Sequence, residues 1–374
     1  MLESLEIAGF RSVVDVQLDL GQLTVVLGAN GTGKSNLYQS LAVLQAAARG
    51  TLAAHFAAQG GLASALWAGP RSKGPVRMTV AARWQDLGFT VELGLPTPPS
   101  PFPTDPVIKR ELVTAAETGA ILAERTNRSA MVRDDEGTRT LFPVELWESE
   151  SLLSQVIDPR RLPVPADIRD RILSWRLYHQ LRSDSQAACR RPRTLCFTPV
   201  LDPSGDDLAA AWLTIDEIGD ADAARGAIAD AFPGAAISVA VDDYGQGLVQ
   251  LTRPGLRRPL SAAELSDGTI RFLALAVALT SPRPPGLLAL NEPETSLHPS
   301  LLGPLAGLIG TAARRSQAWI TTHSRELAAA LAKDHSARVV EIDLVAGRTE
   351  VRGEAGTLVR RVRDRRRSAG ELHE

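Results

Sequence analysis

The amino-acid sequence predicts an α/β fold in which a mixed, largely parallel sheet is accompanied by an antiparallel β layer and a small helical insertion. Three observations support this prediction. The C-terminal third alternates apolar strand-like runs with helical segments, as parallel strands joined by helical crossovers require. Near the N-terminus, an apolar strand leads directly into a glycine-rich loop and a helix. Between these regions, short segments of alternating polarity separated by turns are typical of antiparallel strands.

The N-terminal region contains the first crossover and most of the antiparallel layer. Residues 5–7 and 14–18 alternate with period two, whereas residues 23–27 are continuously apolar, as in a strand buried on both faces. A helix rich in Leu and Ala is expected over residues 34–49. Further strands are expected at 76–84, 89–93, 121–125 and 131–133, with the proline-rich residues 96–106 as a loop or linker.

The middle and the C-terminal region contain the expected helical insertion and the alternating elements. Helical spacing occurs within 165–187 and 206–231, and a hairpin is expected from 236–241 and 247–252. After residue 260, helices are expected at 266–280, 299–313 and 324–332, and strands at 287–291, 317–322 and 338–344. We therefore expect an N-terminal lobe over 1–160, an insertion over 161–235, a C-terminal lobe over 236–350 and a basic tail over 351–374.

The composition excludes several protein classes. The chain has 374 residues, 44% of them hydrophobic, and a formal net charge of −2 from 41 basic and 43 acidic side chains. These values describe a globular protein with a substantial core rather than a disordered chain. The longest apolar runs, 272–279 and 286–290, are too short to cross a bilayer, and the N-terminus lacks the pattern of a signal peptide. We expect a cytoplasmic protein with no membrane partner.

Residues 28–35, GANGTGKS, match the phosphate-binding pattern G-x-x-x-x-G-K-[ST] between a buried strand and a helix. Glycines allow successive backbone N–H groups to surround phosphates, and the ammonium of Lys34 suits the position between β- and γ-phosphates. The hydroxyl of Ser35 would ligate Mg²⁺. The alternative, a glycine-rich turn that caps a helix, needs neither the lysine nor the hydroxyl. The motif therefore predicts binding of a nucleoside triphosphate.

Polar side chains follow two of the predicted C-terminal strands. Asn291 and Glu292 end the apolar run 287–290, and they should lie beside the phosphate loop because ligands gather at the carboxyl ends of strands. Glu292 is the candidate general base, which would accept a proton from the attacking water or hold that water in line. A carboxylate that caps the next helix is the alternative. For Glu294 we expect capping or a surface position.

The next predicted strand ends at His323, which would approach the γ-phosphate from the opposite side. His298 begins a helix with Pro299 in its first turn, and either a dimer-contact loop or a plain helix start fits it. Ser266 and Gly268 precede another apolar helix, where exposed backbone N–H groups suit an anion, although a plain capped helix fits equally well.

Taken in order, these motifs resemble the ABC-type ATPase head shared by RecF, SMC proteins and related AAA-labelled bacterial ATPases. The matching segments are 9–12, 28–35, 265–269, 287–292, 296–299 and 321–324. The resemblance covers about 1–95 and 235–345, and it implies a P-loop NTPase of ABC-ATPase type. The separation of 237 positions between Gly28 and Leu265 resembles the separation in RecF and SMC proteins rather than that in a transporter subunit.

The resemblance implies that two heads bind two ATP molecules between them, so that Ser266 and Gly268 act on the nucleotide of the partner head. It implies catalytic roles for Lys34, Glu292 and His323, and Mg²⁺ held by Ser35, Asn291 and Gln59. The nucleotide contacts that it implies are Arg11, Asn30, Gly31, Thr32, Gly33, Lys34, Ser35 and Asn36.

Asn291 departs from the family pattern, in which the acidic strand ends Asp-Glu. The usual aspartate holds Mg²⁺ through water, and an amide oxygen can still accept a hydrogen bond from that water but adds no negative charge. We therefore expect weaker Mg²⁺ affinity and slower turnover rather than inactivity.

Two functions fit these features. The first is an ATP-dependent dimer that acts on DNA in repair or genome defence, supported by basic clusters in the tail and around the insertion, although the net charge gives no support. The second is a nucleotide-gated module whose slow hydrolysis times the release of a partner effector. Proteins of the OLD group carry a nuclease domain after the ATPase, whereas the 51 residues after His323 hold no clustered carboxylates, so any nuclease would be a separate chain. The basic clusters comprise Arg182, Arg190, Arg191 and Arg193 near the insertion and Arg360, Arg361, Arg363, Arg365, Arg366 and Arg367 in the tail.

Overall fold

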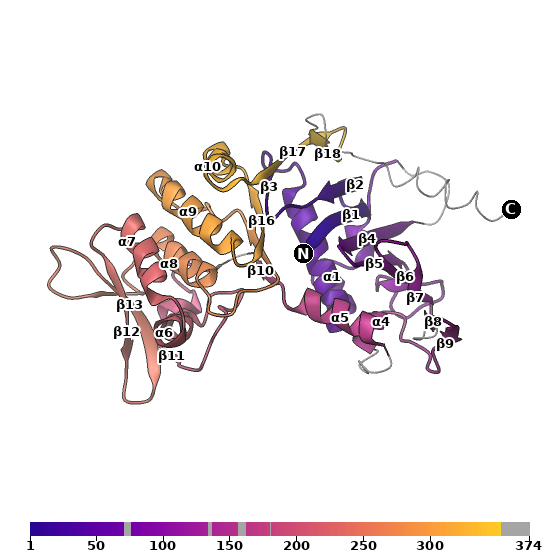
Figure 1. Cartoon of the computed structure of the whole chain (residues 1–374), viewed down its shortest axis with the longest axis horizontal. Helices are drawn as coiled ribbons and strands as arrows, with labels where there is room; N and C mark the ends of the chain where they lie inside the picture. Colours follow the sequence, from indigo (N-terminus) through magenta and orange to yellow (C-terminus); the bar gives the residue numbers. More distant parts are fainter. Residues whose placement is uncertain (71–75, 134–136, 156–161, 180, 353–374) are drawn as a thin grey trace. The chain divides into compact units, whose positions relative to one another are not determined.

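The computed structural model describes residues 1–70, 76–133, 137–155, 162–179 and 181–352, and the chain forms two compact units (Figure 1). The first unit comprises Met1–Gly21, Gly28–Trp175 and Val340–Glu374, and the second comprises Gln22–Leu27 and Arg176–Val339. These units divide the chain differently from the expected lobes, because Gln22–Leu27 joins the second unit and the chain from Val340 onward joins the first. The expected basic tail lies outside the described residues after Arg352.

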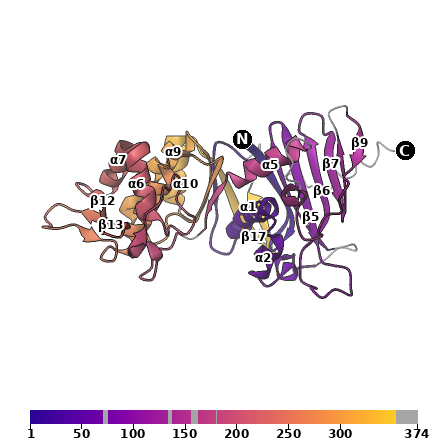
Figure 2. The same cartoon turned by 90° about the horizontal axis from the view of Figure 1, so that it is seen from below.

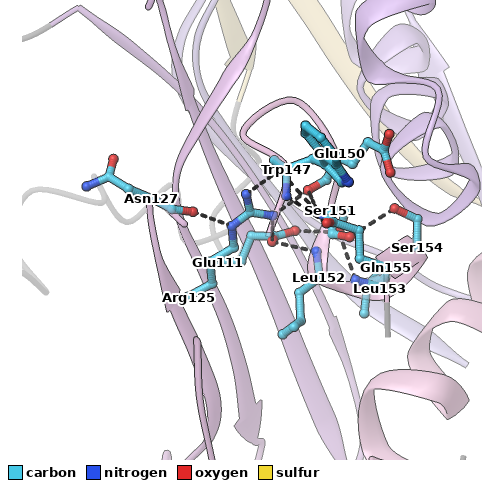
Figure 3. A network of polar contacts seen from close by, with 10 residues as sticks. All are labelled: Glu111, Arg125, Asn127, Trp147, Glu150, Ser151, Leu152, Leu153, Ser154 and Gln155. Atoms are coloured by element: carbon cyan, nitrogen blue, oxygen red, sulfur yellow. Dashed lines mark hydrogen bonds and ion pairs between the residues drawn. The ribbon is translucent and has the colours of Figure 1, made fainter. Parts of the chain in front are cut away.

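An eight-stranded antiparallel sheet forms the body of the first unit, in the order β2-β1-β4-β5-β6-β7-β8-β9. The predicted strands are confirmed, and β6 and β9 are additional. In β6 the charged run from Lys109 to Glu111 interrupts the apolar pattern, although Glu111 is buried (Figure 3). The bounds are β1 Leu2–Phe10, β2 Val13–Asp19, β4 Arg77–Trp84, β5 Leu87–Gly94, β6 Val107–Ala115, β7 Ile121–Thr126, β8 Ser129–Arg133 and β9 Arg139–Leu141.

Helices cover one face of this sheet. Helix α1 (Lys34–Arg49) has the predicted bounds, and it lies with α5 (Pro163–Leu173) on the same side of the strands (Figure 2). The fully buried Leu37, Leu41 and Leu44 face the core, because they recur at helical spacing along one side of α1. The first unit also contains the short helices α2 (Leu52–Ala57), α3 (Leu62–Ala65) and α4 (Leu152–Gln155). From Val340 onward, it includes the antiparallel hairpin of β17 (Arg338–Val345) and β18 (Arg348–Arg352).

The second unit contains a parallel sheet in the order β10-β15-β16-β3. Strands β15 (Leu287–Asn291), β16 (Gln317–Thr322) and β3 (Leu23–Leu27) confirm the prediction. Strand β10 (Arg176–Tyr178) corrects it, because the expected helical segment 165–187 ends at Leu173. With only three residues, β10 is too short to show a periodicity of its own.

In the described part of the second unit, five helices pack with this sheet around one core. Helices α6 (Leu208–Ile218) and α7 (Ala221–Ala231) from the expected insertion share a hydrophobic cluster with α8 (Asp267–Leu279) and α9 (Leu302–Ala313). Trp212 of α6 and Phe272 of α8 both belong to it. Within the expected insertion, α6 and α7 therefore share a core with α8 and α9, whereas α5 belongs to the first unit. Helix α10 (Arg325–His335) and strands β11 (Arg193–Thr194), β12 (Ala236–Val241), β13 (Gln246–Thr252) and β14 (Leu260–Ser261) complete the unit. Within the described ranges, no helix combines the length and the apolar character needed to span a membrane.

Candidate functional site

The phosphate loop of the first unit has the donor set that an anion needs. Gly33 precedes α1 with a φ of 102°, no described side chain caps the helix, and no acidic residue lies in its first turn. The buried ammonium of Lys34 donates to the carbonyl oxygens of Gly28 and Ala29 at 2.8 and 2.9 Å, so it lies folded over the loop. Gly31 has a φ of 82°, and a Cβ atom added to it would meet no described atom within 4 Å. Lys34 and the uncapped N–H groups therefore fit phosphate oxygens.

Thr349 of β18 supports this loop from far along the chain. Its hydroxyl donates to the carbonyl oxygen of Thr32 at 2.9 Å and lies 2.7 Å from Ser12 Oγ. A Cβ atom on Gly33 would clash with Thr349 Oγ1, so glycine at this position is required by packing as well as by its positive φ. The sequence contained no signal for Thr349, because it belongs to no motif.

Arg11, Asn36 and Gln59 are connected by hydrogen bonds in the first unit. Arg11 donates to Gln59 Oε1 at 2.5 Å and to Asn36 Oδ1 at 3.4 Å, and Asn36 Nδ2 donates to Ser12 Oγ at 2.8 Å. The amide nitrogen of Gln59 lies 2.9 Å from His55 Nε2, and burial together with the charge of Arg11 lowers the pKa of His55. The predicted nucleotide contacts Arg11 and Asn36 are thus linked to the loop through Ser12. Because Arg11 already binds the amide oxygen of Gln59, metal binding by Gln59 stays a prediction.

In the second unit, Asn291 and Glu292 lie at the carboxyl end of β15. Asn291 Oδ1 accepts a hydrogen bond from Thr321 Oγ1 at 2.8 Å, which leaves its second lone pair for another donor. Glu292 has a φ of 45°, in the left-handed region that costs a residue with a Cβ about 1–3 kcal/mol. Its Oε2 lies 3.9 Å from His323 Nδ1, so the two predicted catalytic side chains are neighbours.

Glu294 is buried, and the expected surface position is wrong. Only 5% of its side chain is exposed. Its Oε1 accepts hydrogen bonds from Thr322 Oγ1 at 2.5 Å and from the backbone N–H of His323 at 3.1 Å, and it lies 3.2 Å from His323 Nδ1. The chain reverses direction after Pro293, and this turn carries the carboxylate back against the end of β16.

His179 is a candidate that the sequence analysis missed. It follows β10, whose Tyr178 is paired with Leu290, and burial lowers its pKa while the charge of Glu292 opposes that shift. Both neighbours of β15 are therefore followed by a histidine, His179 after β10 and His323 after β16. The sequence offered no clear signal for His179, because the three residues of β10, Arg176–Tyr178, are too few for a periodicity argument.

Residues 265–269, the signature segment that resembles ABC-type ATPase heads, lead into helix α8. Ser266 accepts a hydrogen bond from the N–H of Thr269, and a Cβ on Gly268 would lie 2.6 Å from the carbonyl oxygen of Ser296. Arg190, at the end of the 3₁₀ turn η1 (Ala188–Arg190), is 6% exposed and donates to the carbonyl oxygens of Ala262 and Leu265 and to Asp267 Oδ1. A buried arginine thus holds the segment that leads into the signature helix.

This position of Arg190 weakens the expected basic patch near the insertion. Arg182 pairs with Asp184 at 3.1 Å, and Arg191 donates to Gln186 at 2.6 Å. The side chains of Arg182, Arg190 and Arg191 therefore bind groups within the protein. The arginines of the tail, Arg360 to Arg367, lie outside the described residues.

Two further observations concern His298 and metal binding. His298 accepts a hydrogen bond from the N–H of Ser300 at the start of the 3₁₀ turn η2 (Pro299–Leu301), which supports the plain helix start. Within the described part of the chain, no group of three or more His, Cys, Asp or Glu side chains could hold a metal ion.

Two family models match parts of this chain. Residues 97–329 match the family described as "AAA domain, putative AbiEii toxin, Type IV TA system". The chain belongs to this AAA-domain family. Residues 1–57 also match a family described as "Protein of unknown function (DUF2813)". No curated protein matches significantly.

Solved structures show what fold this AAA-domain chain has. A crystal structure of the SmcHead bound to the C-winged helix domain of ScpA has a TM-score of 0.54 and 15% identity, covering 94% of this chain and 97% of that chain. The Smc head domain with an extended coiled coil bound to the C-terminal domain of ScpA, derived from Pyrococcus furiosus, has a TM-score of 0.53 and 13% identity, covering 100% and 99%. The AAA-domain chain therefore has the fold of an SMC ATPase head, which confirms the predicted ABC-type P-loop fold.

Proposed function

We propose that this AAA-domain protein binds ATP with Mg²⁺ at loop 28–35 and hydrolyses it, and that two heads close around two ATP molecules. The supporting observation is the register of the parallel sheet. Asn291 is paired with Thr321, and Thr322 is paired with Leu27, the residue directly before the phosphate loop. The polar strand ends thus belong to the edge at which ligands gather in open α/β sheets.

In this proposal, each side chain has a separate task. Lys34 and the N–H groups at the start of α1 bind phosphate oxygens, and Glu292 accepts a proton from the attacking water or orients it. His323 stabilises the negative charge that develops on the transferred phosphoryl group. Mg²⁺, when held by Ser35 and Asn291, would supply positive charge to the phosphates. The left-handed backbone of Glu292 supports a functional role, because strain of this kind persists where the surrounding structure enforces it.

The test combines an ATPase assay with a measurement of mass in solution. Lys34→Ala should abolish ATP binding, whereas Glu292→Gln should retain binding, lose turnover and accumulate as an ATP-dependent dimer. Glu217→Gln, at an exposed position of α6, is the matched control and should behave as the wild type. A Glu292→Gln protein that stays monomeric with ATP bound would rule out the shared site.

In the proposed dimer, the signature segment of each head contacts the nucleotide bound to the partner head. Ser266→Arg places a bulky cation at the start of α8 and should block dimerisation while ATP still binds to the monomer. If Ser266→Arg leaves the ATP-dependent dimer intact, the signature does not contribute to a shared site.

We further propose that the dimer works on DNA, in repair or genome defence. Support comes from the resemblance to RecF and SMC proteins and from the arginine-rich tail. DNA should then stimulate the ATPase, and DNA affinity should fall steeply with salt and weaken when residues 353–374 are removed. Unchanged ATPase rates with DNA, together with no measurable DNA binding at low salt, would contradict this role.

The second candidate is a nucleotide-gated module that controls a separately encoded effector or nuclease. Two observations favour it: Arg182, Arg190 and Arg191 near the insertion are engaged within the protein, and Asn291 lacks the charge expected for fast turnover. Both SMC heads named above were solved with a bound ScpA domain, so this fold can carry a protein partner. ATP-dependent capture of a protein encoded beside this chain, without DNA stimulation, would support this alternative.

A further inference from the structure

We infer that Glu294 is a positioning residue that holds the imidazole of His323 by Nδ1 and thereby keeps this ring from binding Glu292. The inference rests on the proposed ATPase function and adds a residue to it. One oxygen of Glu294 accepts hydrogen bonds from the hydroxyl of Thr322 at 2.5 Å and from the backbone N–H of His323 at 3.1 Å, and the ring nitrogen Nδ1 lies 3.2 Å from the same oxygen. A carboxylate only accepts, so Nδ1 must carry the proton in this contact.

The charge of Glu294 needs such a donor. Its side chain is 5% exposed, and its second oxygen, Oε2, has no hydrogen-bond partner among the described residues. Buried carboxylates are costly unless they are paired. Arg271 also interacts electrostatically with Glu294, but its hydrogen bonds go to the carbonyl oxygens of Leu181, Glu292 and Pro293. His323 is therefore the ionisable side chain that can donate directly to the Glu294 carboxylate.

The contact between Glu294 and His323 also determines whether the ring can bind Glu292. The same Nδ1 lies 3.9 Å from Glu292 Oε2, beyond hydrogen-bond distance, but 3.2 Å from Glu294 Oε1. Without Glu294, a small rotation of the ring would let Nδ1–H bind Glu292 and occupy the proposed base. With Glu294 in place, the imidazole of His323 stays off the Glu292 carboxylate.

The contact at Nδ1 leaves Nε2 on the opposite edge of the His323 ring. The side chain of His323 is 45% exposed, so Nε2 is the nitrogen that can reach a ligand. In the neutral ring, a proton on Nδ1 leaves Nε2 as an acceptor, and in the imidazolium both nitrogens donate. Carboxylates that bind the remote nitrogen of metal-ligating histidines orient the ring in this way, and their loss typically reduces metal affinity or activity about 10- to 100-fold.

Two variants of Glu294 distinguish positioning of the His323 ring from mere support of the end of β16. Glu294→Gln keeps an acceptor for Thr322 and His323 but removes the charge, whereas Glu294→Met removes the acceptor and the charge at similar volume. We expect kcat to fall about 10- to 100-fold in Glu294→Met and less in Glu294→Gln, with little change in the KM for ATP. In a His323→Ala background, either change at Glu294 should have almost no further effect on kcat, because residues that act as a unit are not additive.

The position of the ring proton provides a readout that does not depend on activity. Nitrogen NMR of the nucleotide-free protein, with His323 assigned through His323→Ala, should show the proton of the neutral ring on Nδ1 in the wild type. It should stay there in Glu294→Gln and shift toward Nε2 in Glu294→Met. Glu326→Gln, in the exposed first turn of α10, is the control and should change neither the spectrum nor kcat.

The inference is overturned if the ring proton of the wild type lies on Nε2, or if the losses of Glu294→Gln and His323→Ala multiply. If Glu294→Met does not fold, the comparison of Glu294→Gln alone and in the His323→Ala background, together with the wild-type spectrum, still tests the inference. A wild type without ATPase activity but with the expected proton position would refute the proposed function and leave the positioning contact standing.

Discussion

Replacing Arg125 with methionine should release the loop that ends in helix α4. Arg125 and its partner Glu111 are both fully buried in the antiparallel sheet, where their side chains lie 3.3 Å apart (Figure 3). Arg125 also donates to the carbonyl oxygens of Asn127, Trp147 and Glu150. On the other side, Glu111 accepts from the hydroxyl of Ser151 and from the backbone N–H of Leu152 at 2.8 Å. One ion pair therefore fastens residues 147–152 to the sheet.

The expected size of the effect follows from these contacts. Removing one partner of a buried ion pair typically costs about 3–5 kcal/mol, because the other charge stays buried without compensation. The carbonyl oxygens of Trp147 and Glu150 also accept from Gln155 Nε2, so the loss of the donor to Asn127 is the main further cost, about 1 kcal/mol or more. The sum approaches the roughly 5–15 kcal/mol that stabilise a whole domain, so the loop should detach into water before the sheet unfolds. We expect the free energy of unfolding to fall by about 3–5 kcal/mol, the cost of breaking the pair.

Urea unfolding and amide hydrogen exchange measure this effect. The amides of Leu152 and Leu153 should exchange much faster in Arg125→Met than in the wild type, because α4 packs on α1 only while its loop is held. Glu111→Gln should cost less, about 1–3 kcal/mol, since Gln still accepts from Ser151 and Leu152. Arg128→Met, which breaks an exposed pair with Glu145, is the control and should cost about 0–1 kcal/mol. A loss of under about 1 kcal/mol in Arg125→Met, no greater than the control, would refute the reasoning.

Three further predictions concern the two candidate site regions. Thr349→Val should weaken ATP binding several-fold while Thr349→Ser retains it, because only the hydroxyl reaches Thr32; equal affinities by calorimetry would contradict this role. Asn291→Asp should lower the Mg²⁺ concentration needed for half-maximal ATPase and raise turnover, and the prediction is wrong if both stay unchanged. The pKa of His55 is lowered from 6.5, so the unfolded state binds the proton more readily, and stability should fall as the pH drops below that value. His55→Gln should flatten this pH dependence in urea titrations, whereas an unaltered slope would show that other groups cause it.

Local patterns allowed much of the fold to be predicted. Helix α1 begins and ends where expected, and β3 spans the predicted residues, because a continuous apolar run and a phosphate-loop motif are properties of neighbouring residues. Strand β6 was not predicted, since Lys109, Arg110 and Glu111 conceal its pattern. Glu111 can point inward only because Arg125, from the next strand, meets it there. That compensation depends on a pairing that the sequence of β6 alone does not contain.

For the candidate site too, local sequence patterns predicted some residues and the tertiary structure revealed the others. The sequence by itself determined the phosphate loop with Lys34 and the polar strand ends at Asn291, Glu292 and His323, because each is a short motif at the end of a recognisable strand. Only the tertiary structure decided that Thr349 binds the loop, that His179 ends the strand beside Glu292, and that Glu294 is buried against His323. The physical reason is that a buried polar group is stable only with its partner. Thr349 is 317 positions from the carbonyl that it binds, so no local pattern in the chain could indicate the contact.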